Sequence, residues 1–74
     1  MKISLRKQFG LCVRQLRKAR DMSQEAFADR CGFARSYMSR IERGAGNPSL
    51  DAIETIAAAL DVEAKILFDM PGDN

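Results

Sequence analysis

Residues Ser23–Gly44, with the sequence SQEAFADRCGFARSYMSRIERG, form the stretch of this 74-residue chain that decides its fold. Ser23 is suited to cap a helix, because its hydroxyl accepts a hydrogen bond from a free backbone N–H two or three residues later. Gly32 and Gly44 lie where helix ends favour a residue with positive φ. The stretch therefore predicts two short helices joined by a tight turn at Gly32, which is a helix-turn-helix.

The apolar residues of this stretch repeat at helical spacing. Phe27, Ala28 and Cys31 share one face of the first helix. Met38 and Ile41 lie three residues apart on one face of the second helix. If that face points inward, the polar residues around it must point outward. Those residues are Arg35, Ser36, Ser39 and Arg40, with Tyr37 at the edge of the exposed face.

The wider pattern resembles a known family. It consists of Ser23-Gln24-Glu25, Ala28, the run Tyr37–Gly44 with the sequence YMSRIERG, and Asn47–Leu50 with the sequence NPSL. Over about residues 9–68 the chain resembles the phage repressor and Cro type of helix-turn-helix, also called xenobiotic-response-element-like. The resemblance implies an all-α, compact, five-helix lambda-repressor-like DNA-binding domain, in which helices 2 and 3 form the helix-turn-helix. Within the family, the chain looks closest to the controller proteins of restriction-modification systems.

The residues on both sides of the motif are predicted to brace it. A first helix is expected from Ser4 to about Arg20, because Phe9, Val13 and Leu16 repeat at helical spacing. A fifth helix is expected from about residue 63 to residue 68 or 70. A fourth helix is expected to start after Ser49, with an apolar stripe of Leu50, Ile53, Ile56, Ala57 and Leu60.

The third helix carries the residues expected to read DNA. A recognition helix contacts bases through its N-terminal residues, and Arg35 is long enough to form the two hydrogen bonds that guanine accepts. The base-reading residues are predicted to be Arg35, Ser36, Tyr37, Ser39 and Arg40. Phosphate contacts set the register and carry little sequence information. They are predicted for Ser23, Gln24, Arg43 and Asn47.

The resemblance also implies a structural ion pair. In the family an arginine of the first helix pairs with the glutamate of the Ile-Glu-Arg-Gly sequence, and the matching residues here are Arg17 and Glu42. A buried pair with two parallel hydrogen bonds would lock the first helix to the third. The alternative that Arg17 contacts DNA remains open.

The charge of the chain is unevenly distributed. Residues 1–46 hold eleven Lys or Arg and four acidic residues, a net charge of +7, whereas residues 47–74 have a net charge of −5. A basic half beside an acidic half indicates a polyanionic partner for the basic half. Charge alone fits an ordinary solvated surface equally well, and the position of the basic residues on the helix-turn-helix favours nucleic acid.

Length and composition argue against several other classes. A chain of this length makes one small domain, predicted over residues 1–70, with a frayed tail at residues 71–74. No apolar run reaches the roughly 20 residues of a membrane span, and the N-terminus lacks the apolar segment of a secretory signal. With no histidine and no glycine-rich phosphate loop, no enzymatic site, metal or cofactor is expected. Cys12 and Cys31 are interpreted as buried, reduced thiols, the alternative being a disulfide or a metal site.

Together these features predict a cytoplasmic, nucleoid-associated transcriptional regulator, bacterial or phage-encoded, that acts as a homodimer, and the family resemblance favours a controller protein of a restriction-modification system. Its expected partners are a pseudo-palindromic operator of double-stranded DNA and a second copy of the chain, with no small-molecule effector. The alternatives are a phage repressor-like, Cro-like or antitoxin-type repressor, or a protein-interaction module of the same fold. The predicted fifth helix has more large apolar residues than one neighbour can cover. This predicts a dimer interface of Ile66, Leu67, Phe68 and Met70, the alternative being that these residues fill the monomer core.

Overall fold

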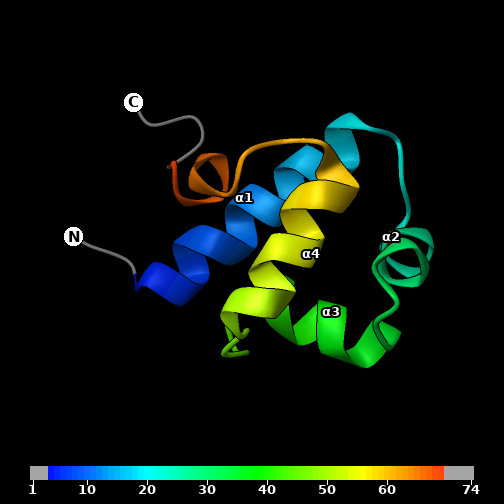
Figure 1. The fold of residues 1–74 in the computed structure, drawn as a ribbon. Helices are drawn as coiled ribbons and strands as arrows, with labels where there is room; N and C mark the ends of the chain where they lie inside the picture. Colours follow the sequence, from blue (N-terminus) through cyan, green and yellow to red (C-terminus); the bar gives the residue numbers. More distant parts are fainter. Residues whose placement is uncertain (1–3, 70–74) are drawn as a thin grey trace.

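The computed structural model describes residues 4–69, which form four α-helices and one 3-10 helix (Figure 1). They are α1 (Leu5–Ala19), α2 (Gln24–Cys31), α3 (Arg35–Glu42), α4 (Leu50–Leu60) and the 3-10 helix η1 (Ala64–Phe68). The predicted all-α fold, with a helix-turn-helix formed by α2 and α3, is confirmed. The fifth predicted helix is present as the short η1, and Met70 and the predicted tail at residues 71–74 lie outside the described residues.

Serine hydroxyls determine where three of the helices begin. The Oγ atoms of Ser4, Ser23 and Ser49 accept hydrogen bonds from the backbone N–H three residues later, at 3.2, 3.0 and 3.1 Å. Each bond satisfies one of the N–H groups that a helix start leaves unpaired. α3 differs, because Ala34 precedes it and supplies no side-chain cap.

The turns between the helices rely on left-handed backbone conformations. Gly32 ends α2 with φ 77° and Gly44 follows α3 with φ 76°, as the sequence predicted. Asp21 and Asp61, with φ 56° and 58°, turn the chain after α1 and α4. A left-handed conformation is unfavourable for most residues, and aspartate tolerates it better than most because its short side chain can bond locally.

The core lies where α1, α2, α3, α4 and η1 meet. α1 packs against α3, α4 and η1, and α2 packs against α3 and α4. The largest fully buried side chains include one or more from each element, namely Val13, Phe27, Met38, Ile41, Ile56, Leu60 and Leu67. In Figure 1, α3 lies along the lower edge of the molecule, away from η1. No helix of the described part combines the length and apolar character that crossing a membrane requires.

The first turn of α4 departs from the predicted apolar stripe. Ile56, Ala57 and Leu60 are buried and Ile53 is half-buried, but Leu50 is 84% exposed. Leu50 lies on the same face of α4 as the buried residues, as helical spacing predicts. It remains exposed because the core ends one turn before it and no other element within residues 4–69 covers it.

Candidate nucleic-acid interface

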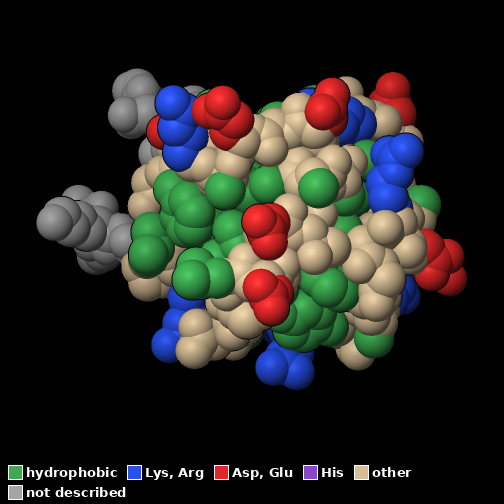
Figure 2. All heavy atoms as spheres, in the orientation of Figure 1, with side chains coloured by type: hydrophobic (Ala, Val, Ile, Leu, Met, Phe, Trp, Pro, Cys, Tyr) green, Lys and Arg blue, Asp and Glu red, His purple; other side chains and the backbone are tan. Residues whose placement is uncertain are grey.

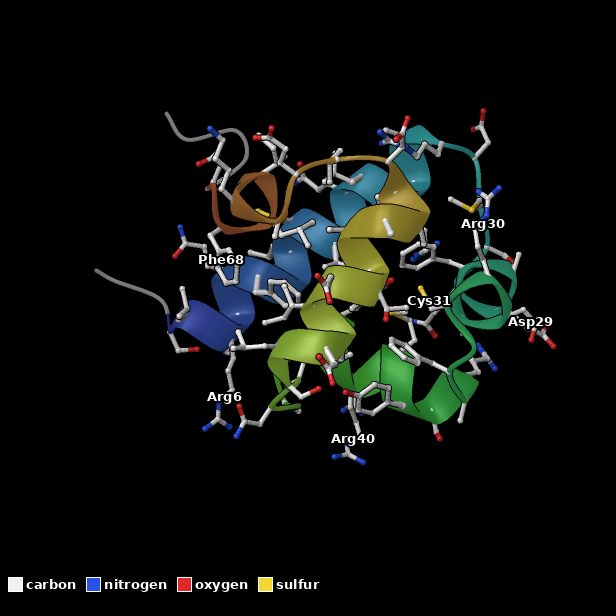
Figure 3. The ribbon with its side chains drawn as sticks, viewed as in Figure 1. Arg6, Asp29, Arg30, Cys31, Arg40 and Phe68 are labelled. Carbon is white, nitrogen blue, oxygen red and sulfur yellow. The ribbon has the colours of Figure 1, made fainter. Side chains whose placement is uncertain are left out.

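α3 turns one face into the core and leaves the opposite face open. Met38 and Ile41 are 0% and 2% exposed and anchor the helix. Arg35, Ser36 and Arg40 are exposed, and Figure 3 shows Arg40 pointing away from the body of the protein. α3 therefore presents a polar, basic surface that opens at its N-terminal end.

Two of the predicted base-reading residues lie at the edge of that surface. Tyr37 and Ser39 are half-buried. The Tyr37 ring meets Phe33 edge to face, with ring centroids 5.0 Å apart, an arrangement that aromatic pairs favour. This contact fixes the Tyr37 ring against the turn between α2 and α3.

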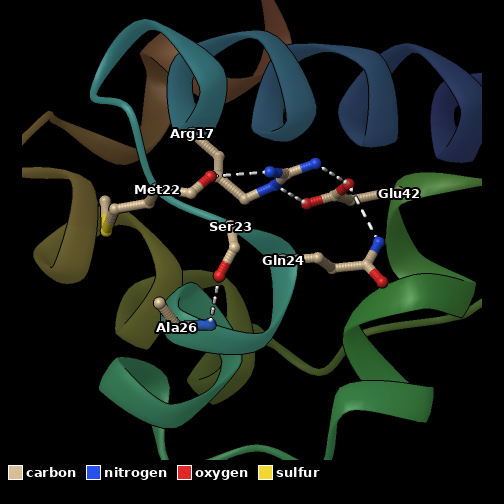
Figure 4. Close-up of polar contacts among 6 residues, drawn as sticks. All are labelled: Arg17, Met22, Ser23, Gln24, Ala26 and Glu42. Carbon is tan, nitrogen blue, oxygen red and sulfur yellow. Dashed lines mark hydrogen bonds and ion pairs between the residues drawn. The ribbon is translucent and has the colours of Figure 1, made fainter.

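A buried hydrogen-bond network holds α3 to α1 and α2 (Figure 4). Arg17 donates from Nε to Glu42 Oε2 at 2.7 Å and from Nη2 to Glu42 Oε1 at 3.0 Å. Its Nη1 donates to the Met22 carbonyl at 2.7 Å, and Gln24 Nε2 donates to Glu42 Oε1 at 3.2 Å. Arg17 and Glu42 are each 7% exposed, so neither is free to act as a surface charge. The structure thus brings Arg17 and Glu42 together inside the protein and fixes the angle of α3.

The four predicted phosphate-contacting residues occupy the two ends of the helix-turn-helix. Ser23 and Gln24 stand at the start of α2, where the Ser23 hydroxyl caps the helix and the Gln24 amide nitrogen bonds Glu42. Arg43 follows α3 directly, Asn47 lies in the loop before α4, and both are exposed. Gln24 consequently has an internal partner that sequence reasoning did not anticipate.

Gly10 is a positioning residue that sequence reasoning missed. It is buried in the middle of α1, where a Cβ atom would lie 2.8 Å from the Glu42 carbonyl oxygen and closer still to that of Ile41. Its missing side chain therefore allows α1 to cross directly over the end of α3. The available signal was a lone glycine inside a helical pattern, which costs about 1 kcal/mol relative to alanine and often has a packing reason.

An apolar groove of about 390 Å³ opens between the N-terminal ends of α1 and α4, beside η1. Leu5 and Leu50 are 62% and 84% exposed at its rim. Figure 2 shows hydrophobic side chains gathered over these neighbouring segments. We call this surface the α1–α4 groove, and its lining consists of Leu5, Arg6, Phe9, Asn47, Pro48, Leu50, Ile53 and Phe68.

The predicted dimer interface on the fifth helix is only partly available. Leu67 is 0% exposed, so its prediction as an interface residue is wrong, because the monomer core already covers the whole side chain. Phe68 lines the α1–α4 groove and packs on Phe9 with ring centroids 5.2 Å apart. Ile66 lines a separate depression on the other side of η1, and Met70 lies outside the described residues.

Both cysteines are buried free thiols. Burial raises the pKa of Cys31 to about 11. Burial and, to a smaller extent, the nearby Asp69 charge raise the pKa of Cys12, whose thiol donates to the Asp69 carbonyl. Both thiols are therefore held in their protonated, unreactive form. Within residues 4–69 no three potential metal ligands of the Cys, Asp and Glu type cluster together.

Comparison with known proteins matches the chain to DNA-binding regulators. A family model described as a helix-turn-helix domain matches residues 8–65. Control protein C.BamHI from Bacillus amyloliquefaciens is 49% identical over 67 residues, which are 89% of this chain and 83% of that protein.

Solved structures give the same result. The restriction-modification controller protein C.AhdI from Aeromonas hydrophila is 45% identical, with a TM-score of 0.81 over 84% of this chain and 94% of that chain. The biofilm-formation master regulator SinR, solved in complex with DNA, is 39% identical, with a TM-score of 0.77 over 82% of this chain and 98% of that chain.

Proposed function

The chain belongs to the helix-turn-helix family, and from this premise we propose that it is a sequence-specific DNA-binding transcriptional regulator, a homodimeric controller protein of a restriction-modification system. The resemblance found in Ser23–Gly44 is confirmed by the family match and by the controller-protein relatives. These relatives are regulators, which also confirms the prediction of a binding protein rather than an enzyme. Its proposed place of action is DNA in the bacterial cytoplasm.

The exposed face of α3 is the observation that supports this function most directly. Arg35 stands at the first position of the helix and is exposed, while Met38 and Ile41 fix the opposite face in the core. An arginine there can place its two donors on the O6 and N7 acceptors of guanine in the major groove. Base readout is assigned to Arg35, Ser36, Tyr37, Ser39 and Arg40, and phosphate contact to Ser23, Gln24, Arg43 and Asn47.

The α1–α4 groove is the proposed homodimer contact. Leu5 and Leu50 expose large apolar side chains beside Phe68 in one groove, and a contiguous exposed apolar patch is a feature of interaction sites. A two-fold interface would pair the groove with its own copy. The two α3 helices would then enter successive major grooves about 34–36 Å apart, which requires a pseudo-palindromic operator.

Selection of binding sites from random duplex DNA tests the function. The wild-type protein should enrich a two-fold symmetric sequence and bind it with a steep dependence on salt, because phosphate contacts release counterions. Failure to enrich any sequence would contradict a sequence-specific regulator. A protein-interaction module of the same fold would show neither result.

Arg35→Ala tests which residue reads the operator. It should weaken binding to the selected duplex by about 1–3 kcal/mol and relax the preference at one base pair in each half-site. Arg30→Ala is a suitable control, because Arg30 is an exposed arginine on α2 and lies away from Arg40 and α3 in Figure 3. An equal loss of affinity for all sequences in Arg35→Ala would make Arg35 a phosphate contact.

A further inference from the structure

A second groove opens on the opposite flank of α1, where it meets the end of α3. It has a volume of about 530 Å³, and we call it the α1–α3 groove. We propose that this groove seats the phosphate backbone of the DNA duplex, so that α1 extends the contact made by the helix-turn-helix. The inference rests on the proposed function. The groove is lined by Lys7, Leu11, Arg14, Glu42, Arg43 and Ala45.

Two glycines bring the basic face of α1 against the end of α3. Gly10 lets the α1 backbone approach the carbonyl oxygens of Ile41 and Glu42. At Gly44 a Cβ atom would lie 2.6 Å from Lys7 Cγ and 2.8 Å from Lys7 Cα. The stem of Lys7 therefore rests on the turn that follows α3. The basic residues of α1 are thus placed by backbone contacts beside Arg43, the first residue after α3.

The groove carries unbalanced positive charge. Within residues 4–69, Lys7, Arg14 and Arg43 form no ion pair with a carboxylate. Glu42 is the acidic residue of the lining, but its carboxylate is bonded to Arg17 at 2.7 and 3.0 Å and to Gln24 at 3.2 Å. The groove is thus open to an anion, and three cationic residues line it, two from α1 and one directly after α3.

The DNA backbone suits this groove because of where the groove lies. Arg43 belongs both to the groove and to the end of the recognition helix, so a strand passing α3 reaches the groove without leaving the protein surface. Lysine and arginine contacts to phosphate add affinity and salt dependence without sequence preference. The alternative is that the cations offset the negative C-terminal end of α3, which would make them contribute to stability and leave DNA binding unaffected.

Lys7→Gln and Arg14→Gln distinguish these roles, with Lys65→Gln as the control. Lys65 is exposed on η1, far from α3 in sequence, and its loss changes the net charge equally. The measurement is the affinity of each variant, across a salt series, for a duplex selected by the wild-type protein and for an unselected duplex of equal length. In each groove variant the negative slope of log affinity against log salt should become shallower by about two for a dimer, since each protomer loses one phosphate contact.

The groove variants should also keep the base preference and the folding of the wild type. The ratio of affinities for the two duplexes should stay near its wild-type value, Arg14→Lys should restore the slope, and the thermal melting point should remain within a few degrees of the wild type. An unchanged slope in both groove variants, with steep salt dependence retained in the wild type, would overturn the groove contact alone. If the wild type binds neither duplex, the proposed function falls together with the groove.

Discussion

Two sides of α1 meet the rest of the protein in different ways. On one side α1 crosses the end of α3, where Gly10 removes the side chain that would separate the two backbones and Arg17 bonds the buried Glu42. On the other side α1 meets the start of α4, where Leu5 and Leu50 remain largely exposed.

The two sides of α1 differ in whether the chain covers its own surface: the side facing α3 is packed and hydrogen-bonded, and the side facing α4 leaves apolar surface exposed. Within residues 4–69 no buried side-chain nitrogen or oxygen lacks a hydrogen-bond partner, and the α1–α3 crossing satisfies its buried charges internally. The α1–α4 groove instead presents apolar area with no covering element in the monomer. Substitutions in the buried contacts where α1 crosses α3 should therefore change the stability of the fold and the angle of α3. Substitutions in the α1–α4 groove should change dimerisation.

Glu42→Ala should have the largest effect on stability. It leaves the Arg17 guanidinium buried without its carboxylate, and breaking a buried ion pair in this way typically costs about 3–5 kcal/mol. The measurement is the free energy of unfolding by urea. Glu54→Ala, which removes an exposed carboxylate from α4, should change that free energy by no more than about 0.5 kcal/mol.

A double variant separates the buried charge from the packing around it. Arg17→Met combined with Glu42→Leu removes both charges and keeps similar volumes, so it should recover much of the stability lost in Glu42→Ala. If Glu42→Ala is as stable as the wild type, the crossing does not depend on the network, and the contrast between the two sides of α1 fails.

The sequence predicted where the helices begin and which faces point inward better than it predicted the contacts between residues far apart in the chain. The helix starts at Ser23 and Ser49 and the inward face of Met38 and Ile41 follow from capping and periodicity, which involve near neighbours. Arg17 and Glu42 were paired through the family resemblance. The close packing at Gly10 was not predicted, and Leu50 was predicted in the apolar stripe of the fourth helix but is exposed, because these environments depend on how α1 crosses α3 and on where the core ends.

The base-reading assignment shows the same limit. Periodicity correctly separates the exposed Arg35, Ser36 and Arg40 from the buried Met38 and Ile41. It does not reveal that Phe33 holds the Tyr37 ring or that Gln24 bonds Glu42. Both contacts join residues whose proximity is created by the turn between α2 and α3 and by the packing of the two helices.

Gly10→Ala should produce the next largest loss of stability. The added methyl group would meet the carbonyl oxygens of Ile41 and Glu42, which belong to helical backbone and can move only if α1 or α3 shifts. Overpacking of this kind costs about 1–3 kcal/mol, although alanine favours the helix by about 1 kcal/mol over glycine. A net loss is therefore expected in urea unfolding.

The matched control for this glycine is Gln15→Ala, an exposed site on the same helix. It should leave stability within about 0.5 kcal/mol of the wild type. A Gly10→Ala variant that is more stable than the wild type would show that helix propensity outweighs the contact and that α1 does not need to lie so close to α3.

Leu50→Ser should have the smallest effect on the stability of the monomer. It tests most directly whether the α1–α4 groove is a dimer contact. With 84% of Leu50 exposed, its removal should change the unfolding free energy of the monomer by no more than about 0.5 kcal/mol.

If a second copy covers the α1–α4 groove, the apolar burial lost in Leu50→Ser is worth about 1.5–3 kcal/mol for each leucine. Because a two-fold dimer buries two copies, the dimer dissociation constant in sedimentation should rise at least about a hundredfold. Leu11→Ser removes a 39% exposed leucine that lines the α1–α3 groove instead, and it should leave the dimer unchanged. Equal dimerisation of wild type and Leu50→Ser would mean that the apolar groove is not the interface, and that exposure at the start of α4 has another cause.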